Sequence, residues 1–157
     1  MTAVMSPDGV YRYRLERSVN MLAKGTVCFV MLNPSMADAE RDDPTIRRCE
    51  RFAYDWGMGR LVVVNLYALR STDPKALRRH DNPVGPANEY HVLEAAKEAD
   101  LLVCAWGNHG GEVGRNLRGW LWERGFNPYV LALTKAGQPQ HPLYIAANKR
   151  PIPWVAS

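Results

Sequence analysis

Residues 26–34 read TVCFVMLNP, an almost wholly apolar run that ends abruptly on an asparagine and a proline. Further apolar runs follow at residues 61–64, 101–105 and 129–133. Short, continuous apolar runs are typical of parallel strands that are covered on both faces. We therefore predict four parallel core strands, preceded by a half-buried edge strand at residues 10–15, where VYRYRL alternates apolar and polar side chains.

The segments between these runs have helical patterns. Asp43 and Pro44 predict a capped helix that ends near Trp56 and Gly57, and further helices are expected at residues 86–99 and 112–124. The side chains predicted to share one helix face are Tyr90, Leu93 and Ala96 or Lys97 in the second helix, and Val113, Leu117, Trp120 and Leu121 in the third. Strands that alternate with helices predict an α/β fold, a three-layer α/β/α domain around a central, mostly parallel four-stranded sheet. We expect residues 142–153 to form a packed irregular tail.

Length and composition narrow the class of protein. The 157 residues are enough for one domain, residues 1–157, and 46% hydrophobic with 23% charged residues is ordinary globular composition. Neither a membrane span nor a signal peptide is apparent, so we expect a soluble, cytoplasmic protein. The three cysteines have no metal-ligand spacing and are expected to be buried free thiols. The net charge of +4 is compatible with an anionic partner but does not identify one, and nothing indicates the oligomeric state.

Polar residues follow each of the four core runs. In open parallel sheets, ligands bind beyond the carboxyl ends of the strands. Asn33 follows the first run, Asn65 the second, Trp106 the third, and a loop that contains His141 follows the fourth. We expect these four segments to converge on one rim of the sheet.

Each of these residues also has a structural interpretation. The Asn33-Pro34 dipeptide by itself favours a simple turn, and Asn65 is equally suited to tie down a loop or to read the edge of a pyrimidine base. His141 stands between two prolines, Pro139 and Pro142, in a rigid setting that suits a donor aimed at a developing negative charge.

Other candidate groups have weaker signals. Glycines in residues 107–111 fit a turn as well as an anion site. Four acidic residues near Asn33 are candidate general bases, namely Asp38, Glu40, Asp42 and Asp43. A hydrolase that uses Cys104 or Ser35 is the least favoured alternative, because neither residue has the sequence context of a nucleophile elbow.

Five segments together closely resemble the bacterial and phage family known as domain of unknown function 1643, over about residues 11–145. They are LNPSMAD at 32–38, DDPTIRRC at 42–49, VVVNLYALRSTDP at 62–74, AWG at 105–107 and TKAGQPQHPLY at 134–144. More distantly, Asn33-Pro34, Asn65, Trp106-Gly107 and His141-Pro142 resemble, in the same order, the four motifs of the uracil-DNA glycosylase superfamily.

The distant resemblance implies a uracil-DNA glycosylase-like fold and a role for each of several residues. It implies that Asn33 positions the attacking water, that Asn65 reads the flipped pyrimidine and that His141 hydrogen-bonds the departing base. Further substrate-binding residues by the same resemblance are Pro34, Ser35, Tyr67, Trp106, Gly107 and Tyr144, and DNA contacts are Arg70, Asn108 and Leu143. The expected partner is a nucleobase, nucleotide or DNA, with no metal or cofactor.

Departures from the superfamily pattern affect the expected activity. Asn33 replaces the aspartate of the fastest members, so hydrolysis is expected to be slow. Ser35 stands where strict uracil enzymes carry an aromatic residue, and Leu143-Tyr144 replace the Ser-Pro of the last motif. The alternative is a module of the same fold that binds a nucleobase, a nucleotide or DNA without cleaving it.

Overall fold

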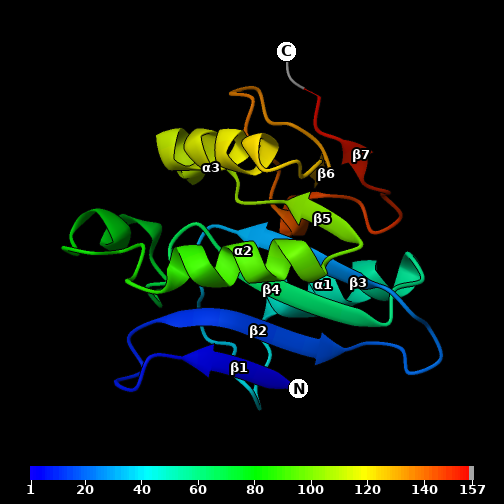
Figure 1. The fold of residues 1–157 in the computed structure, drawn as a ribbon, viewed down its shortest axis with the longest axis horizontal. Helices are drawn as coiled ribbons and strands as arrows, with labels where there is room; N and C mark the ends of the chain where they lie inside the picture. The colour runs from blue at the N-terminus through cyan, green and yellow to red at the C-terminus, as the bar shows by residue number, and fades with distance from the viewer. Residues whose placement is uncertain (156–157) are drawn as a thin grey trace.

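The computed structural model describes residues 1–155 and contains one seven-stranded mixed sheet with three α-helices (Figure 1). In chain order the elements are β1 (Thr2–Met5), β2 (Arg12–Ser18), β3 (Thr26–Met31), α1 (Pro44–Asp55), β4 (Arg60–Asn65), η1 (Pro74–Arg78), α2 (Asn88–Glu98), β5 (Leu101–Cys104), η2 (Asn108–Gly110), α3 (Gly111–Glu123), β6 (Tyr129–Val130), η3 (Pro142–Tyr144) and β7 (Ile152–Pro153).

The sheet has the strand order β1-β2-β4-β3-β5-β6-β7. The four predicted core strands are its parallel centre, β4-β3-β5-β6, and β3 and β4 pair in register from Thr26 opposite Arg60 to Met31 opposite Asn65. The predicted sheet of four strands plus one edge strand is nevertheless too small. β1 pairs outside β2, and β7 pairs outside β6, both antiparallel.

Two sequence-based predictions are corrected by these additional strands. Residues 10–15 do not form the edge of the sheet, because β1 covers β2 from outside. Residues 142–153 are not wholly irregular, since η3 and β7 lie within them. β7 has only two residues and includes Pro153, which lacks a backbone donor and is tolerated because the strand is at the edge.

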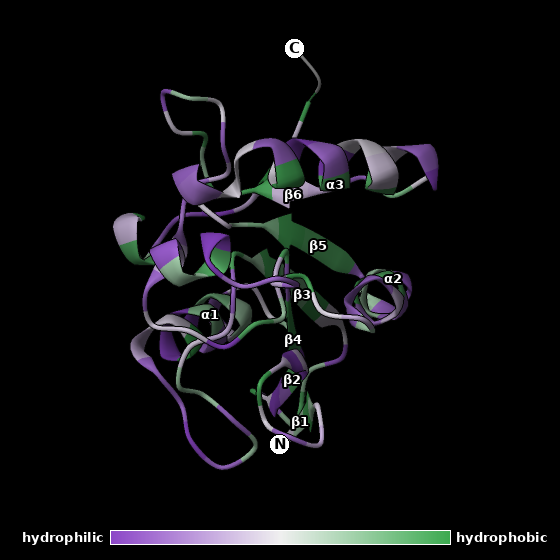
Figure 2. Cartoon of the chain, turned by 90° about the vertical axis from the view of Figure 1, so that its left-hand side faces the viewer, coloured by the Kyte–Doolittle hydropathy of each residue, from purple (hydrophilic) through white to green (hydrophobic). Residues whose placement is uncertain are grey.

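The helices form layers on both faces of the sheet, as Figure 2 shows with the sheet seen edge-on. α1 packs Ile46, Cys49 and Phe52 onto one face, while α2 and α3 share the other face through Val92 and Leu121. The predicted α/β fold, with helices on both faces of a mostly parallel sheet, is therefore confirmed.

The helix boundaries agree with those predicted from the sequence within a few residues, but the buried face of α2 differs from the predicted one. Asp43 caps α1, as predicted, by accepting a hydrogen bond from the Ile46 N–H at 2.9 Å. In α2 the buried residues include Asn88, Val92 and Ala96, whereas Tyr90 is exposed. The buried stripe begins with a polar residue, which hid it from an apolar-periodicity argument.

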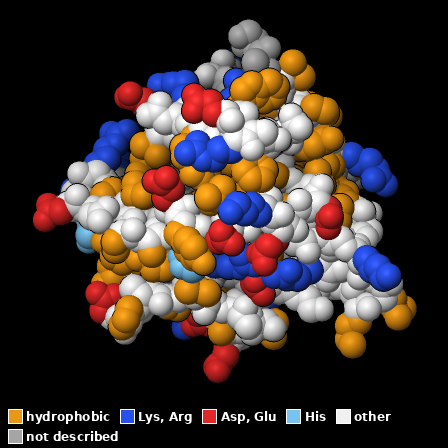
Figure 3. All heavy atoms as spheres, viewed as in Figure 1, with side chains coloured by type: hydrophobic (Ala, Val, Ile, Leu, Met, Phe, Trp, Pro, Cys, Tyr) orange, Lys and Arg blue, Asp and Glu red, His pale blue; other side chains and the backbone are white. Residues whose placement is uncertain are grey.

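Charged side chains of both signs are interspersed on the face of the molecule seen in Figure 3. The net positive charge is therefore not gathered on this face into a single basic patch. Some of the charges are paired, since Arg14 of β2 forms ion pairs with Glu16 and with Glu98 of α2. Among residues 1–155, no helix has the length and apolar character that a bilayer span requires.

Candidate functional site

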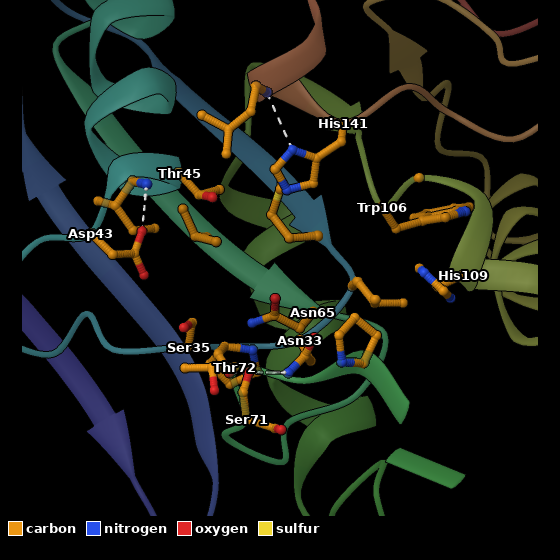
Figure 4. Close-up of a pocket in the computed structure, with 18 of the residues that line it drawn as sticks. Asn33, Ser35, Asp43, Thr45, Asn65, Ser71, Thr72, Trp106, His109 and His141 are labelled. Atoms are coloured by element: carbon orange, nitrogen blue, oxygen red, sulfur yellow. Dashed lines mark hydrogen bonds between the residues drawn. The ribbon is translucent and has the colours of Figure 1, made fainter. Parts of the chain in front are cut away.

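A cleft of about 550 Å³ lies at the carboxyl ends of the parallel strands (Figure 4). It is lined by residues from all four segments that the sequence places after the core strands. The predicted site residues that line it are Asn33, Pro34, Ser35, Asn65, Trp106, Gly107, Asn108, His141, Leu143 and Tyr144. The expected convergence of remote segments on one cavity is present.

Asn65 is the last residue of β4, and its side chain lies in the cleft. Val63 and Leu61, two and four residues earlier, face α1, so the alternation of the strand directs Asn65 to the same face. The side chain is only 1% exposed, and neither its Nδ2 nor its Oδ1 has a hydrogen-bond partner. An unpaired buried polar group costs about 1–3 kcal/mol, and no hydrogen bond of this side chain within residues 1–155 offsets that cost.

Asn33 lies beside Asn65 in the cleft, and its Nδ2 is fully engaged. It donates to the carbonyl oxygens of Ser71 at 2.9 Å, Pro34 at 3.1 Å and Leu69 at 3.4 Å. These bonds tie the segment after β4 to the segment after β3, which is a longer-range structural role than the simple turn that the dipeptide favours. They leave Oδ1 as the atom of Asn33 with which a ligand or a water molecule can bond.

His141 projects into the cleft from the loop before η3, and its Nε2 is directed towards the side of the cleft where Asn65 lies (Figure 4). Its Nδ1 accepts a hydrogen bond from the Leu143 N–H at 3.2 Å, so the proton of the neutral ring is on Nε2. Burial lowers the pKa of His141 below 6.5, against the opposing charge of Asp43. The imidazole is therefore neutral at pH 7 and can donate one hydrogen bond into the cleft.

Trp106 lines the cleft and is fixed by hydrogen bonds. Its ring is 1% exposed, and its Nε1 donates to Gln138 Oε1 at 2.8 Å. Gln138 in turn donates from Nε2 to the Gly111 carbonyl at 3.1 Å, while the Gly107 N–H donates to the Pro139 carbonyl at 2.7 Å. These bonds join the turn after β5 to the loop that carries His141.

Two predicted site residues lie outside the cleft lining, Tyr67 and Arg70. Tyr67 packs on the α2 and α3 side of the sheet, where burial raises the pKa of its hydroxyl. Arg70 lies three residues later in the chain, and the Nε of Arg70 is buried without a partner. Beyond the end of β4 the chain no longer alternates as a strand, so the sequence did not fix the side on which these residues lie.

The cleft also contains residues that the sequence did not single out for binding. They are Arg12, Met31, Leu32, Thr45, Ile46, Val63, Ser71, Thr72, Pro74, His109, Thr134 and Gln140. Asp43, predicted as a helix cap and as a candidate general base, lines the cleft as well. No signal in the sequence separates these hydroxyl and amide groups from ordinary loop residues. Arg12 is the most unexpected, because it belongs to a strand that the sequence places away from the site.

Asp43 is the one carboxylate in the lining of the cleft among residues 1–155. Its Oδ1 accepts from the Ile46 N–H, and its Oδ2 accepts from the Ala37 N–H at 3.3 Å. Both oxygens are thus engaged in holding α1 and the loop before it. The other candidate bases, Asp38, Glu40 and Asp42, are not part of the lining.

A thiol nucleophile does not fit the cleft. Cys104 is completely buried, lies outside the lining and has a pKa raised by that burial, whereas nucleophilic cysteines need a thiolate. The described part of the chain also contains no group of three His, Cys, Asp or Glu side chains placed to hold a metal ion.

The family model described as Protein of unknown function (DUF1643) matches residues 12–143. The chain belongs to this family. The matched range of the DUF1643 chain runs from the start of β2 into η3, so it includes every residue of the cleft lining except Tyr144. No curated protein and no solved structure matches the chain, and the resemblance to uracil-DNA glycosylases therefore rests on the four short motifs.

Proposed function

We propose that the cleft binds a pyrimidine-type base through Asn65 and that the protein hydrolyses the N-glycosidic bond of the bound nucleotide. The observation that carries this proposal is the buried amide of Asn65, with a donor and an acceptor both unpaired. A pyrimidine edge offers an acceptor beside a donor, which is the complement of an amide. Binding of the base supplies the two hydrogen bonds that the free protein lacks.

His141 and Asn33 fit the chemistry of glycosidic cleavage. When the C1′–N1 bond breaks, its electron pair leaves with the base, and negative charge develops on the base oxygen. A neutral histidine that donates from Nε2 stabilises that charge, and one such donor contributes about 3 kcal/mol, or about a hundredfold in rate. Water adds to C1′, held by Asn33 Oδ1, and the proton that it loses finally replaces the sugar on the base.

A second candidate function is base binding without cleavage. One observation favours it: Asp43, the one carboxylate in the lining among residues 1–155, already accepts backbone N–H groups on both oxygens. This carboxylate would have to take a proton from water while it holds those two N–H groups. Hydrolysis, where it occurs, is expected to be slow.

An oligonucleotide panel separates these functions. End-labelled strands that contain uracil, thymine opposite guanine, or 5-hydroxymethyluracil are incubated with the protein, and abasic sites are revealed by alkaline cleavage. We expect abasic sites with the wild type and their loss in Asn65→Ala and His141→Ala. Asn148→Ala, an exposed amide outside the cleft, is the matched control and should retain activity.

The binding measurement completes the test. Base-dependent binding without abasic sites identifies the non-cleaving module. If the wild type neither binds nor cleaves any strand of the panel, the proposed function is refuted.

A further inference from the structure

Arg12 reaches the cleft because β2 contains a bulge. Met5 of β1 pairs with Arg12 and Val4 pairs with Arg14, so Tyr13 is an extra residue in β2. A bulge shifts the side-chain alternation by one residue. Accordingly, Tyr13 and Arg14 lie on the same side: Tyr13 stacks on His91 of α2 and Arg14 pairs with Glu98 of α2, while Arg12 is turned to the opposite side, towards α1.

The start of β2 lies beside the end of β4, because the two strands are antiparallel. The Arg12 N–H donates to the carbonyl of Ala68, three residues beyond Asn65. On the α1 side of the sheet, the Arg12 and Asn65 side chains line the same cleft. A single ligand in the cleft can therefore contact both.

The guanidinium of Arg12 is buried with few partners. It is 2% exposed, its Nη1 donates to the Ala37 carbonyl at 2.9 Å, and its Nε is buried with no partner. Burial lowers its pKa to about 10, against the nearby charge of Asp43, so it remains a cation at pH 7. No carboxylate of residues 1–155 forms an ion pair with it.

Arg17, on the same strand, is a second buried arginine with which the partners of Arg12 can be compared. It is 1% exposed, yet its Nε forms an ion pair with Asp42 at 2.9 Å. Its remaining donors bond to the carbonyls of Glu16, Asp38 and Arg41. The ion pair of Arg17 offsets the cost of burying its charge. Arg12, which lines the cleft, has no such ion pair.

We propose that Arg12 binds the phosphate of the ligand, so that the cleft binds a pyrimidine nucleotide more tightly than a free base or a nucleoside. The base half of this proposal rests on the proposed function, whereas the phosphate half rests on Arg12. Guanidinium groups match phosphate oxygens in geometry and charge. The cleft volume of about 550 Å³ falls within the range of sites for whole small-molecule ligands, about 300–1,000 Å³.

Calorimetric titration with deoxyuridine 5′-monophosphate and with deoxyuridine tests the proposal on the wild type alone. We expect the nucleotide to bind about ten- to hundredfold more tightly, the range for a charge-assisted hydrogen bond. A trinucleotide with uracil at its centre distinguishes the source of the phosphate: tighter binding of the trinucleotide assigns a diester within DNA, and tighter binding of the monophosphate assigns a free nucleotide.

Variants then separate the two halves of the proposal. Arg12→Gln, which can still donate to Ala37, should bind the nucleotide no more tightly than deoxyuridine and leave deoxyuridine binding unchanged. Asn65→Ala should weaken both ligands. Arg51→Gln removes an exposed arginine on α1 outside the cleft and should change neither affinity.

Equal affinity of the wild type for nucleotide and nucleoside would overturn the role of Arg12 and leave base binding in place. Binding of neither ligand would instead overturn base binding. If Arg12→Gln fails to fold by circular dichroism, Arg12→Lys, which keeps the charge, together with the wild-type affinity ratio, still decides the question.

Discussion

Two asparagines with buried amides meet at the end of β4 and use their hydrogen-bonding atoms differently. Asn88 of α2 donates from Nδ2 to the carbonyls of Asn65 at 2.8 Å and Leu66 at 3.2 Å. The side chain of Asn65 bonds to nothing. One amide therefore fastens a helix to a strand, while the other has no structural bond to lose.

This difference predicts opposite results for the same substitution. Asn88→Ala should lower the free energy of unfolding by about 1–3 kcal/mol, because it deletes the donor and leaves buried carbonyls less well satisfied. Asn65→Ala should cost less than about 1 kcal/mol, since an unsatisfied amide is removed, but should abolish ligand binding. Urea denaturation and calorimetric titration measure the two effects. A loss of stability in Asn65→Ala as large as that in Asn88→Ala would contradict a binding role for Asn65.

At the same scale, the sequence predicted some site residues and missed others for a definable reason. Asn33, Asn65 and His141 were found because they follow apolar runs whose carboxyl ends meet in a parallel sheet. Arg12 was missed because VYRYRL reads as a regular strand, and the bulge depends on pairing with β1. Tyr67 was assigned to the site by the resemblance to uracil-DNA glycosylases, and the direction of the chain after β4, which places it elsewhere, cannot be read from periodicity.

At the scale of elements, α3 is placed by glycines that leave room for Trp106. A Cβ added at Gly114 would lie 2.5 Å from Trp106 Nε1, and one at Gly110 would lie 2.1 Å from Trp106 Cδ1. A Cβ at Gly119, on the same helix, meets no atom within 4 Å. Gly114 is therefore required by the close approach of Trp106, whereas no neighbouring atom requires a glycine at position 119.

Alanine substitutions test this close approach. Gly114→Ala should destabilise the protein by about 1–3 kcal/mol through overpacking, although alanine is the better helix former. Gly119→Ala should stabilise it by about 0.5–1 kcal/mol through helix propensity alone. Chemical denaturation followed by circular dichroism compares the pair, and equal shifts in the two variants would rule out the contact with Trp106 as the reason for Gly114.

The elements that the sequence missed are those whose stability comes from partners remote in the chain. β3, β4 and β5 are nearly continuous apolar runs with buried side chains and are recognisable alone. β1 has four residues, and β7 has two, so each exists through pairing with β2 or β6. Local patterns carry little information about such additions to a sheet edge.

At the scale of the whole molecule, the carboxyl group of Glu50 should make the free energy of unfolding depend on pH. Burial, and then a hydrogen bond with Asp42, raise the pKa of Glu50 on α1 to about 7 from its ordinary 4.5. The folded state therefore binds more protons than the unfolded chain between these pH values, and stability is lost as the pH rises from about 4.5 to 7. His141 and His91, whose pKa values are lowered, act in the opposite sense below pH 6.5.

Glu50→Gln isolates this contribution. The amide can donate to Asp42 at any pH, so the variant should unfold about 2–4 °C above the wild type at pH 8, which is about 1 kcal/mol after allowance for solvent screening. At pH 4.5 the difference should be small. Glu123→Gln, at an exposed position at the end of α3, should show no such dependence on pH; if it behaves as Glu50→Gln does, Glu50 is not the responsible group.

The extra residue in β2 sets the side of the sheet on which Arg12 lies. A related chain that is one residue shorter between Arg12 and Leu15 would turn its guanidinium away from the cavity and present the neighbouring side chain in its place. Its preference should then shift from charged to neutral ligands although every other cavity residue is retained. The spacing between two positions in this strand is thus a marker by which members of the family can be sorted according to the charge of what they bind.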